Sequence, residues 1–214
     1  MNKKTLILAL SLMLIFCVTM GVTLAYLNES TDPVVNTFIP AELGSLELDE
    51  NDTTDYNSNE SDHDYLVVPG QSITKDPRVT FSFSNENGEV VDAYVFVKID
   101  ANGWTSSTDG MTFTKTVGSV SDGLSFTIDT FWTKLDGTPA GTYVYYKAVD
   151  VDVPSTHVTN QKVIANNTIS VSTDIVKESI GQVSAAGLTF TAYAIQQLGF
   201  NTPLAAWSEV SGQN

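Results

Sequence analysis

Three things are scarce in this 214-residue chain: cysteine, basic residues and charge as a whole. The 10 lysines and arginines stand against 25 acidic residues, giving a net charge of −15. This balance excludes nucleic acid as a partner, because such binding needs basic charge to release counterions. It also excludes attachment to anionic lipid by charge alone. Charged residues make up 16% of the chain, too few for a coiled coil, and 42% apolar residues are too many for a disordered tail.

The first 25 residues have the form of a secretory signal peptide. Two lysines near the start precede 24 uncharged residues, 5–28, with a leucine-rich centre. The small residues on either side of Leu24 form a T-L-A pattern, which predicts cleavage between Ala25 and Tyr26 by a signal peptidase. The alternative is an uncleaved membrane anchor, since the apolar stretch is long enough to span a bilayer of about 30 Å.

Cleavage would remove the only cysteine, Cys17, together with the signal. The remaining chain, 26–214, has 10 − 2 = 8 basic and 25 acidic residues, a net charge of −17. An exported chain without cysteine has neither disulfides nor thiol chemistry, so its hydrophobic core alone must stabilise it. A chain of this length can bury roughly 70% of its extended-chain surface. We therefore expect a single domain over 26–214.

The exported chain is expected to form β-structure almost throughout. Residues 79–84 alternate apolar and polar side chains, which is the period of a strand with one buried face. Further strands are expected at 43–48, 93–99, 111–116, 124–131, 142–151, 168–176 and 188–195. Asn-Gly and Asp-Gly dipeptides predict turns at 87–88, 102–103, 109–110, 122–123 and 136–137. Short strands at this spacing predict an all-β fold, an antiparallel β-sandwich of jelly-roll type.

One short helix is expected near the C-terminus, over 203–210. Pro203 suits the first helical position, and Thr202 suits the N-cap. A helix of about two turns does not persist unpacked, so Trp207 is expected to anchor it on the sandwich. The alternative is an exposed Trp207 at a protein interface.

An acidic segment interrupts the strand pattern. Nine acidic residues and no basic one occur from Glu42 to Asp64. The part at 49–64 lacks apolar alternation, which predicts a solvated loop. Carboxylates this close in sequence can supply oxygen ligands for calcium, although the D-x-D-x-D-G spacing is absent. Calcium binding is the alternative interpretation of the loop.

Residues for catalysis or zinc binding are few. The two histidines, His63 and His157, lie far apart in the sequence, and there is no H-E-x-x-H motif. His157 could join Asp150 and Asp152 in a metal site, but these aspartates alternate with valines, as on the wet face of a strand. We therefore predict no catalytic, cofactor or metal site.

Two serine patterns resemble nucleophile motifs. Ser72 and Lys75 match S-x-x-K, but Pro-Gly and Asp-Pro on either side break the helix that this motif needs. Ser119 stands where a nucleophile elbow has its first glycine, and a sharp turn there would be strained. Neither pattern predicts an enzyme.

Three segments carry a resemblance to a known family. They are GVTLAYLNESTDPVVNTFIPAELGSLELDE, PGQSITKDPRVTFSFSNENGEVVDAYVFVKID and LTFTAYAIQQLGFNTPLAAW. Together they resemble, over nearly the whole chain, the TasA/camelysin family of Gram-positive bacteria, whose signal is cut by a dedicated SipW-type signal peptidase. The resemblance implies a cut after Ala25, a jelly-roll fold and secretion to the cell surface or the biofilm extracellular matrix.

The resemblance also implies a mode of assembly. Fibre-forming members insert the N-terminal segment of one mature subunit into the sheet of the next, by strand addition. The matching donor strand here is 26–36, extended to Phe38, and its apolar residues are Tyr26, Val34, Val35 and Phe38. The implied partners are the signal peptidase and further copies of the chain or related fibre subunits. Contact with the membrane is expected only through an uncleaved signal.

The expected function is therefore structural: a fibre-forming or fibre-associated subunit that is not an enzyme. One alternative is a secreted metalloprotease, because camelysin is described as one, yet neither histidine lies in a recognisable zinc motif. Another is a monomeric surface adhesin that uses the acidic loop 49–64 as its contact.

Overall fold

A computed structural model describes Lys3 and the residues 44–50, 65–83, 91–185 and 187–212. From Ala41 to Asn214 the chain forms one compact unit. Several predictions fall outside the described residues: the signal peptide with its cut between Ala25 and Tyr26, the donor residues Val34, Val35 and Phe38, His63, the loop over 51–64, and the turn at 87–88.

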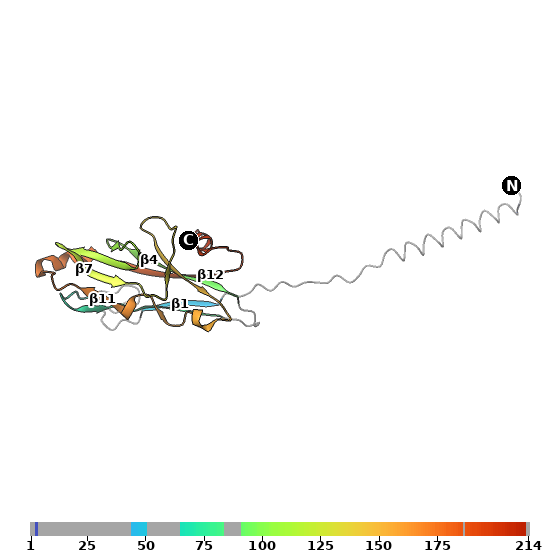
Figure 1. Cartoon of the computed structure of the whole chain (residues 1–214), viewed down its shortest axis with the longest axis horizontal. Helices are drawn as coiled ribbons and strands as arrows, with labels where there is room; N and C mark the ends of the chain where they lie inside the picture. The colour runs from blue at the N-terminus through green and yellow to red at the C-terminus, as the bar shows by residue number, and fades with distance from the viewer. Residues whose placement is uncertain (1–2, 4–43, 51–64, 84–90, 186, 213–214) are drawn as a thin grey trace. The chain divides into compact units, whose positions relative to one another are not determined.

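The described chain is built from short antiparallel strands, as predicted (Figure 1). In chain order these are β1 (Ser45–Glu50), β2 (Ser72–Thr74), β3 (Pro77–Ser82), β4 (Ala93–Ala101), β5 (Thr105–Ser106), β6 (Thr112–Val117), β7 (Val120–Thr127), β8 (Thr133–Lys134), β9 (Tyr143–Val149), β10 (Gln161–Lys162), β11 (Thr168–Val171) and β12 (Leu188–Gln196). Three 3-10 helices, η1 (Pro154–Thr156), η2 (Ala165–Asn167) and η3 (Lys177–Ala185), and one α-helix, α2 (Pro203–Ser211), complete it.

These strands form three sheets. The strand orders are β1-β3-β10, β2-β11-β7-β6-β5 and β12-β4-β9-β8. In the view of Figure 1, β4 and β12 lie above β1 and β11. One core joins all three sheets, because Val79 and Phe81 of β3, Phe126 of β7 and Val97 of β4 belong to a single buried cluster. The chain is thus an all-β sandwich with one short C-terminal helix, and the jelly-roll connectivity stays a prediction.

Strand β4, in the four-stranded sheet, has buried apolar side chains on both of its faces. Val95, Val97 and Ile99 point into the shared core, where each is fully buried. Phe96 points the opposite way and is fully buried too, in a second cluster on the outer face of the sheet. A strand with apolar residues on both faces reads as a near-continuous hydrophobic run, as 93–99 does.

Helix α2 covers that outer face, as the sequence predicts. Thr202 is the N-cap, where its hydroxyl accepts a hydrogen bond from the Ala205 amide at 3.2 Å, and Pro203 begins the helix. Trp207 is only 6% exposed, and its ring centroid lies 5.5 Å from that of Phe96 and 5.3 Å from that of Tyr193. The prediction that Trp207 anchors the helix is confirmed.

Several local predictions are wrong. The dipeptide at 122–123 does not form a turn but lies inside β7, where the pairing with β6 shifts register. A Cβ on Gly123 would come within 2.7 Å of the Val117 side chain, so glycine permits the close approach at this irregularity. The turn itself is at 118–119, where Gly118 has a φ of 61°.

The others concern element ends. The strand expected over 124–131 begins earlier, at Val120, and ends at Thr127. Strand β1 runs to Glu50, so Asp49 and Glu50 pair with β3 instead of beginning the acidic loop. The strand expected over 168–176 stops at Val171, and the 3-10 helix η3, which the sequence analysis did not predict, follows at Lys177. Within the described residues, no helix has both the length and the apolar character to cross a membrane.

Candidate functional site: the open edge of strand β12

Among the described strands, β12 ends the four-stranded sheet and pairs with β4 alone. The pairing runs through all nine residues without a register shift, from Leu188 opposite Ala101 to Gln196 opposite Ala93. None of these nine residues is buried, whereas five of the nine in β4 are. Among the described residues no strand pairs with the other side of β12. Within this described part of the chain, its outward-facing backbone groups form a long open edge.

The core-facing side chains of β12 are also incompletely buried. Phe190, Ala192 and Ala194 pack against the shared core but stay half-buried. Their partners on β4, such as Val97 opposite Ala192, are fully buried. A further strand beside β12 would cover these core-facing residues.

Strand β12 also lacks the usual protection of an edge. Natural edge strands avoid unwanted pairing by short length, charge, proline or bulges. The stretch 179–208, which contains β12, has no charged residue at all, and β12 has no proline and no bulge. Strand β12 is therefore suited to accept a further strand.

The short edge strands of the three sheets are protected. Strands β2, β5, β8 and β10 have only two or three residues each. Beyond β10, the Asp129 amide donates a hydrogen bond to the Val163 carbonyl at 2.8 Å, and Ile128 bridges to Ile164, which ties the three-stranded sheet to its neighbour.

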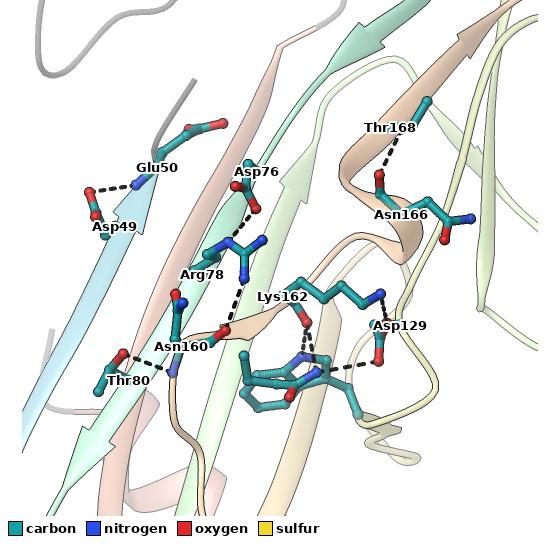
Figure 2. Close-up of polar contacts among 12 residues, drawn as sticks. Asp49, Glu50, Asp76, Arg78, Thr80, Asp129, Asn160, Lys162, Asn166 and Thr168 are labelled. Atoms are coloured by element: carbon teal, nitrogen blue, oxygen red, sulfur yellow. Dashed lines mark hydrogen bonds and ion pairs between the residues drawn. The ribbon is translucent and has the colours of Figure 1, made fainter. Parts of the chain in front are cut away.

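Polar side chains also lie around the β10 end of the three-stranded sheet (Figure 2). The Arg78 guanidinium donates to the Asn160 carbonyl at 3.1 Å and pairs with Asp76. The Lys162 ammonium lies 3.3 Å from the Asp129 carboxylate. Strand β10 is thus enclosed by contacts rather than open.

Strand β1 is the other long edge, at the opposite end of the three-stranded sheet. It approaches β12 across the sandwich (Figure 1). Its sequence, SLELDE, carries three acidic residues in six. Leu48 faces the same side as the core residue Leu46 and yet is 38% exposed. We call the region where β1 approaches β12 the seam.

A buried lysine lies at one end of the seam. Lys75 is 5% exposed, and its ammonium forms an ion pair with Glu50, the last residue of β1. It donates a hydrogen bond to the Tyr65 hydroxyl at 2.9 Å, and that hydroxyl lies 3.3 Å from the Glu50 carboxylate. The same ammonium lies 5.8 Å from the ring centroid of Phe190 on β12. One cation thus contacts both long edge strands.

The metal candidates of the sequence do not come together. The His157 Nε2 atom lies 3.1 Å from the Asp150 carbonyl and 3.2 Å from the Val151 carbonyl, so the ring binds the backbone of a turn. The Asp150 carboxylate accepts a hydrogen bond from the Asp152 amide. The described residues include no group of three histidine, cysteine or acidic side chains that could hold a metal ion.

The serine patterns have structural explanations. Ser72 is exposed on β2, whereas Lys75 is buried, so the two side chains do not meet as the S-x-x-K motif requires. Ser119 lies in the two-residue turn between β6 and β7, not between a strand and a helix.

Two shifted pKa values lie away from the seam, around the turn between β5 and β6. A hydrogen bond from Ser107, with a further one from the Met111 amide, lowers the pKa of Asp109. Burial raises the pKa of Tyr145, whose hydroxyl donates to the Gly110 carbonyl of the same turn. Asp109 thus closes the turn on itself, and Tyr145 fastens the turn to the four-stranded sheet.

Sequence reasoning missed the seam because it depends on which strands end each sheet. The charge-free stretch 179–208 was visible in the sequence and would have marked β12 as an unprotected strand. The role of Lys75 had no local signal, since its partners Glu50, Tyr65 and Phe190 come from three separate parts of the chain.

Comparisons with protein-family models, curated proteins and solved structures gave no significant match. The TasA/camelysin resemblance therefore stays a prediction based on the three sequence segments.

Proposed function

We propose that this protein is a secreted structural subunit of the cell surface or of an extracellular biofilm matrix, which forms or joins fibres by donor-strand exchange. The open edge of β12 carries the proposal. An added strand gains main-chain hydrogen bonds along such an edge, and its alternate side chains fix the register. This role needs neither a catalytic group nor a cofactor.

The proposed donor is the segment Tyr26–Phe38 of a neighbouring subunit. Within it, Val34, Val35 and Phe38 lie in a stretch bounded by Pro33 and Pro40 that contains no charge. This uncharged part of the donor suits an uncharged acceptor, because a charged side chain beside β12 would lose its hydration without gaining a partner. The TasA/camelysin resemblance supports the same segment.

The first test is to purify residues 26–214 and examine them by negative-stain microscopy and light scattering. Filaments would support the proposal. Casein digestion, with and without a chelator, runs alongside, and chelator-sensitive cleavage would favour the protease alternative. Soluble monomers at high protein concentration, at low and at high salt, without proteolysis would contradict self-assembly and favour the adhesin.

The second test separates donor-strand exchange from other association. Deletion of 26–38 is expected to abolish polymerisation while circular dichroism stays that of a folded β-protein. A synthetic peptide of residues 26–38 should block elongation by occupying free β12 edges, and a scrambled peptide of the same composition should not. If instead the segment pairs within its own sheet, deletion lowers the melting temperature and the peptide has no effect on association.

A further inference from the structure

Lys75 joins the two edges of the seam through a single buried cation. Its carboxylate partner, Glu50, ends β1, and the Phe190 ring belongs to β12. Its backbone is fixed as well, since the Lys75 amide donates to the Asn167 carbonyl at 2.9 Å. The Tyr65 ring, 5.0 Å from the ammonium, encloses it further.

Stability alone is a weak reason for such an arrangement. Removing two charges from water costs about as much as their attraction returns, so apolar replacements of a buried ion pair are often as stable or more so. A buried pair does favour one geometry, because its partners must meet at hydrogen-bond distance. Among the described residues, Lys75 and Asp76 are the buried charged side chains. The Lys75 ammonium makes a cation–π contact with Phe190 of the long edge strand β12.

We propose that Lys75 is a positioning residue that preorganises the acceptor edge. It holds the end of β1 and the Phe190 region of β12 at one spacing in the free subunit, so that an incoming strand meets an edge already in place. Preorganisation of this kind favours association by removing the cost of ordering the site. This inference rests on the proposed function, because it names what prepares the same edge for its partner.

The experiment replaces both charges together, since removing Glu50 alone would leave the buried Lys75 ammonium without its carboxylate partner. The variant Lys75→Met with Glu50→Leu keeps the volume and is expected to melt close to the wild type. Lys75→Arg keeps the charge and should behave as the wild type. The matched control is Lys98→Met, which removes a lysine paired with Asp100 on the outer face of β4, where Lys98 is partly exposed.

Two readouts are measured on residues 26–214. The first is amide hydrogen exchange at a concentration where light scattering shows monomers. The double variant is expected to exchange about tenfold faster over β12 near Phe190 and over β1, as local opening becomes easier. The second is the rate of filament growth, which should fall by about tenfold because the edge must be ordered during association.

The outcomes separate the two proposals. If the wild type forms no filaments, the proposed function fails, and the exchange comparison still decides whether Lys75 holds the edge. If the wild type assembles and the double variant assembles at the same rate, the positioning role of Lys75 is wrong whatever the exchange shows, and the proposed function stands. Unchanged exchange over β12 in the double variant would also overturn the positioning role of Lys75. So would a Lys75→Arg variant whose filaments grow more slowly than those of the wild type.

Discussion

Strands β1 and β12 each end a sheet, and they differ in what they present to a second chain. Strand β1 has six residues, of which three are acidic. Strand β12 has nine residues and no charge, and it lies in a charge-free stretch of 30 residues, 179–208, within a chain of net charge −15. Length and charge are two of the means by which edges avoid pairing. One edge is thus protected and the other is not.

This contrast shows that the acidic residues are distributed unevenly between the two edge strands. Close to the seam, Glu50 is neutralised by Lys75. Glu47 and Asp49 are exposed on β1, where they oppose pairing with another acidic subunit. The uncharged β12 is left as the place where two subunits can approach without repulsion between side chains in contact.

The strongest test of the contrast places the same cation on each edge. Ala192 faces the core, but the open edge leaves it half-buried. In Ala192→Lys the ammonium can reach water past that edge in the free subunit, whereas an added strand would bury it. We expect filament growth to stop, as measured by light scattering. Glu47→Lys on exposed β1 is the control, and it should assemble.

A variant Ala192→Lys that still forms filaments would show that β12 is not the acceptor. Its thermal unfolding must be measured in parallel, because loss of the fold would also stop growth. Cooperative unfolding within a few degrees of the wild type makes the comparison valid.

The next largest effect concerns what supports β12 from its outer face. Tyr193 of β12 packs on Trp207 with ring centroids 5.3 Å apart. Trp207→Ala is expected to lower the free energy of unfolding by about 3–5 kcal/mol, because it leaves a cavity beneath helix α2. Chemical denaturation measures this. A loss below about 1 kcal/mol would mean that the helix is held by other contacts.

Much of this fold follows from the sequence, and the reasons are local. The alternation around Val79 and Phe81, the apolar run of β4 and the Thr202-Pro203 start of α2 each report short-range physics, and each is found in the structure. The turn at 122–123 was predicted wrongly because Asp-Gly also suits a strand irregularity, and the packing of Gly123 on Val117 decided between the two.

The candidate site could be predicted only in part. A donor segment can be proposed from its apolar residues and from a resemblance. An acceptor edge cannot, because strand order is a long-range property: β12 pairs with β4, about ninety residues earlier in the chain, and with no other described strand. The same reason hides Lys75, whose partners meet only in the folded chain.

An interior strand gives a smaller test of the same contrast. Tyr145 lies on β9, which is paired on both sides, and its hydroxyl donates to the Gly110 carbonyl. Tyr145→Phe removes this hydrogen bond and should cost about 1 kcal/mol of stability near neutral pH. It should leave filament growth unchanged, because β9 offers no edge. Slower growth would mean that assembly senses overall stability rather than the edge.

The pH dependence of this variant follows from the raised pKa of Tyr145, which burial causes. The folded state binds the phenolic proton more tightly than the unfolded state, whose pKa is about 10. The stabilisation that the protonated Tyr145 contributes is fully present below pH 10 and is lost as the pH rises above that value. The wild type should therefore lose its advantage over Tyr145→Phe in alkaline solution, as measured by urea unfolding at several pH values.

The smallest expected change in stability comes from making β1 resemble β12. In Glu47→Thr with Asp49→Thr, two exposed acids become β-branched residues that suit a strand. The free energy of unfolding should change by no more than about 0.5 kcal/mol, because exposed substitutions away from packed features rarely do more. Association should change far more, because the second long edge loses both of its exposed acidic residues. We expect the variant to form lateral aggregates or branched filaments visible by negative staining, and to form them even when residues 26–38 are deleted, since β1 would then pair without a donor strand. If the variant behaves as the wild type in both backgrounds, the acidic residues of β1 do not protect it, and the difference between the two edges must lie in length alone.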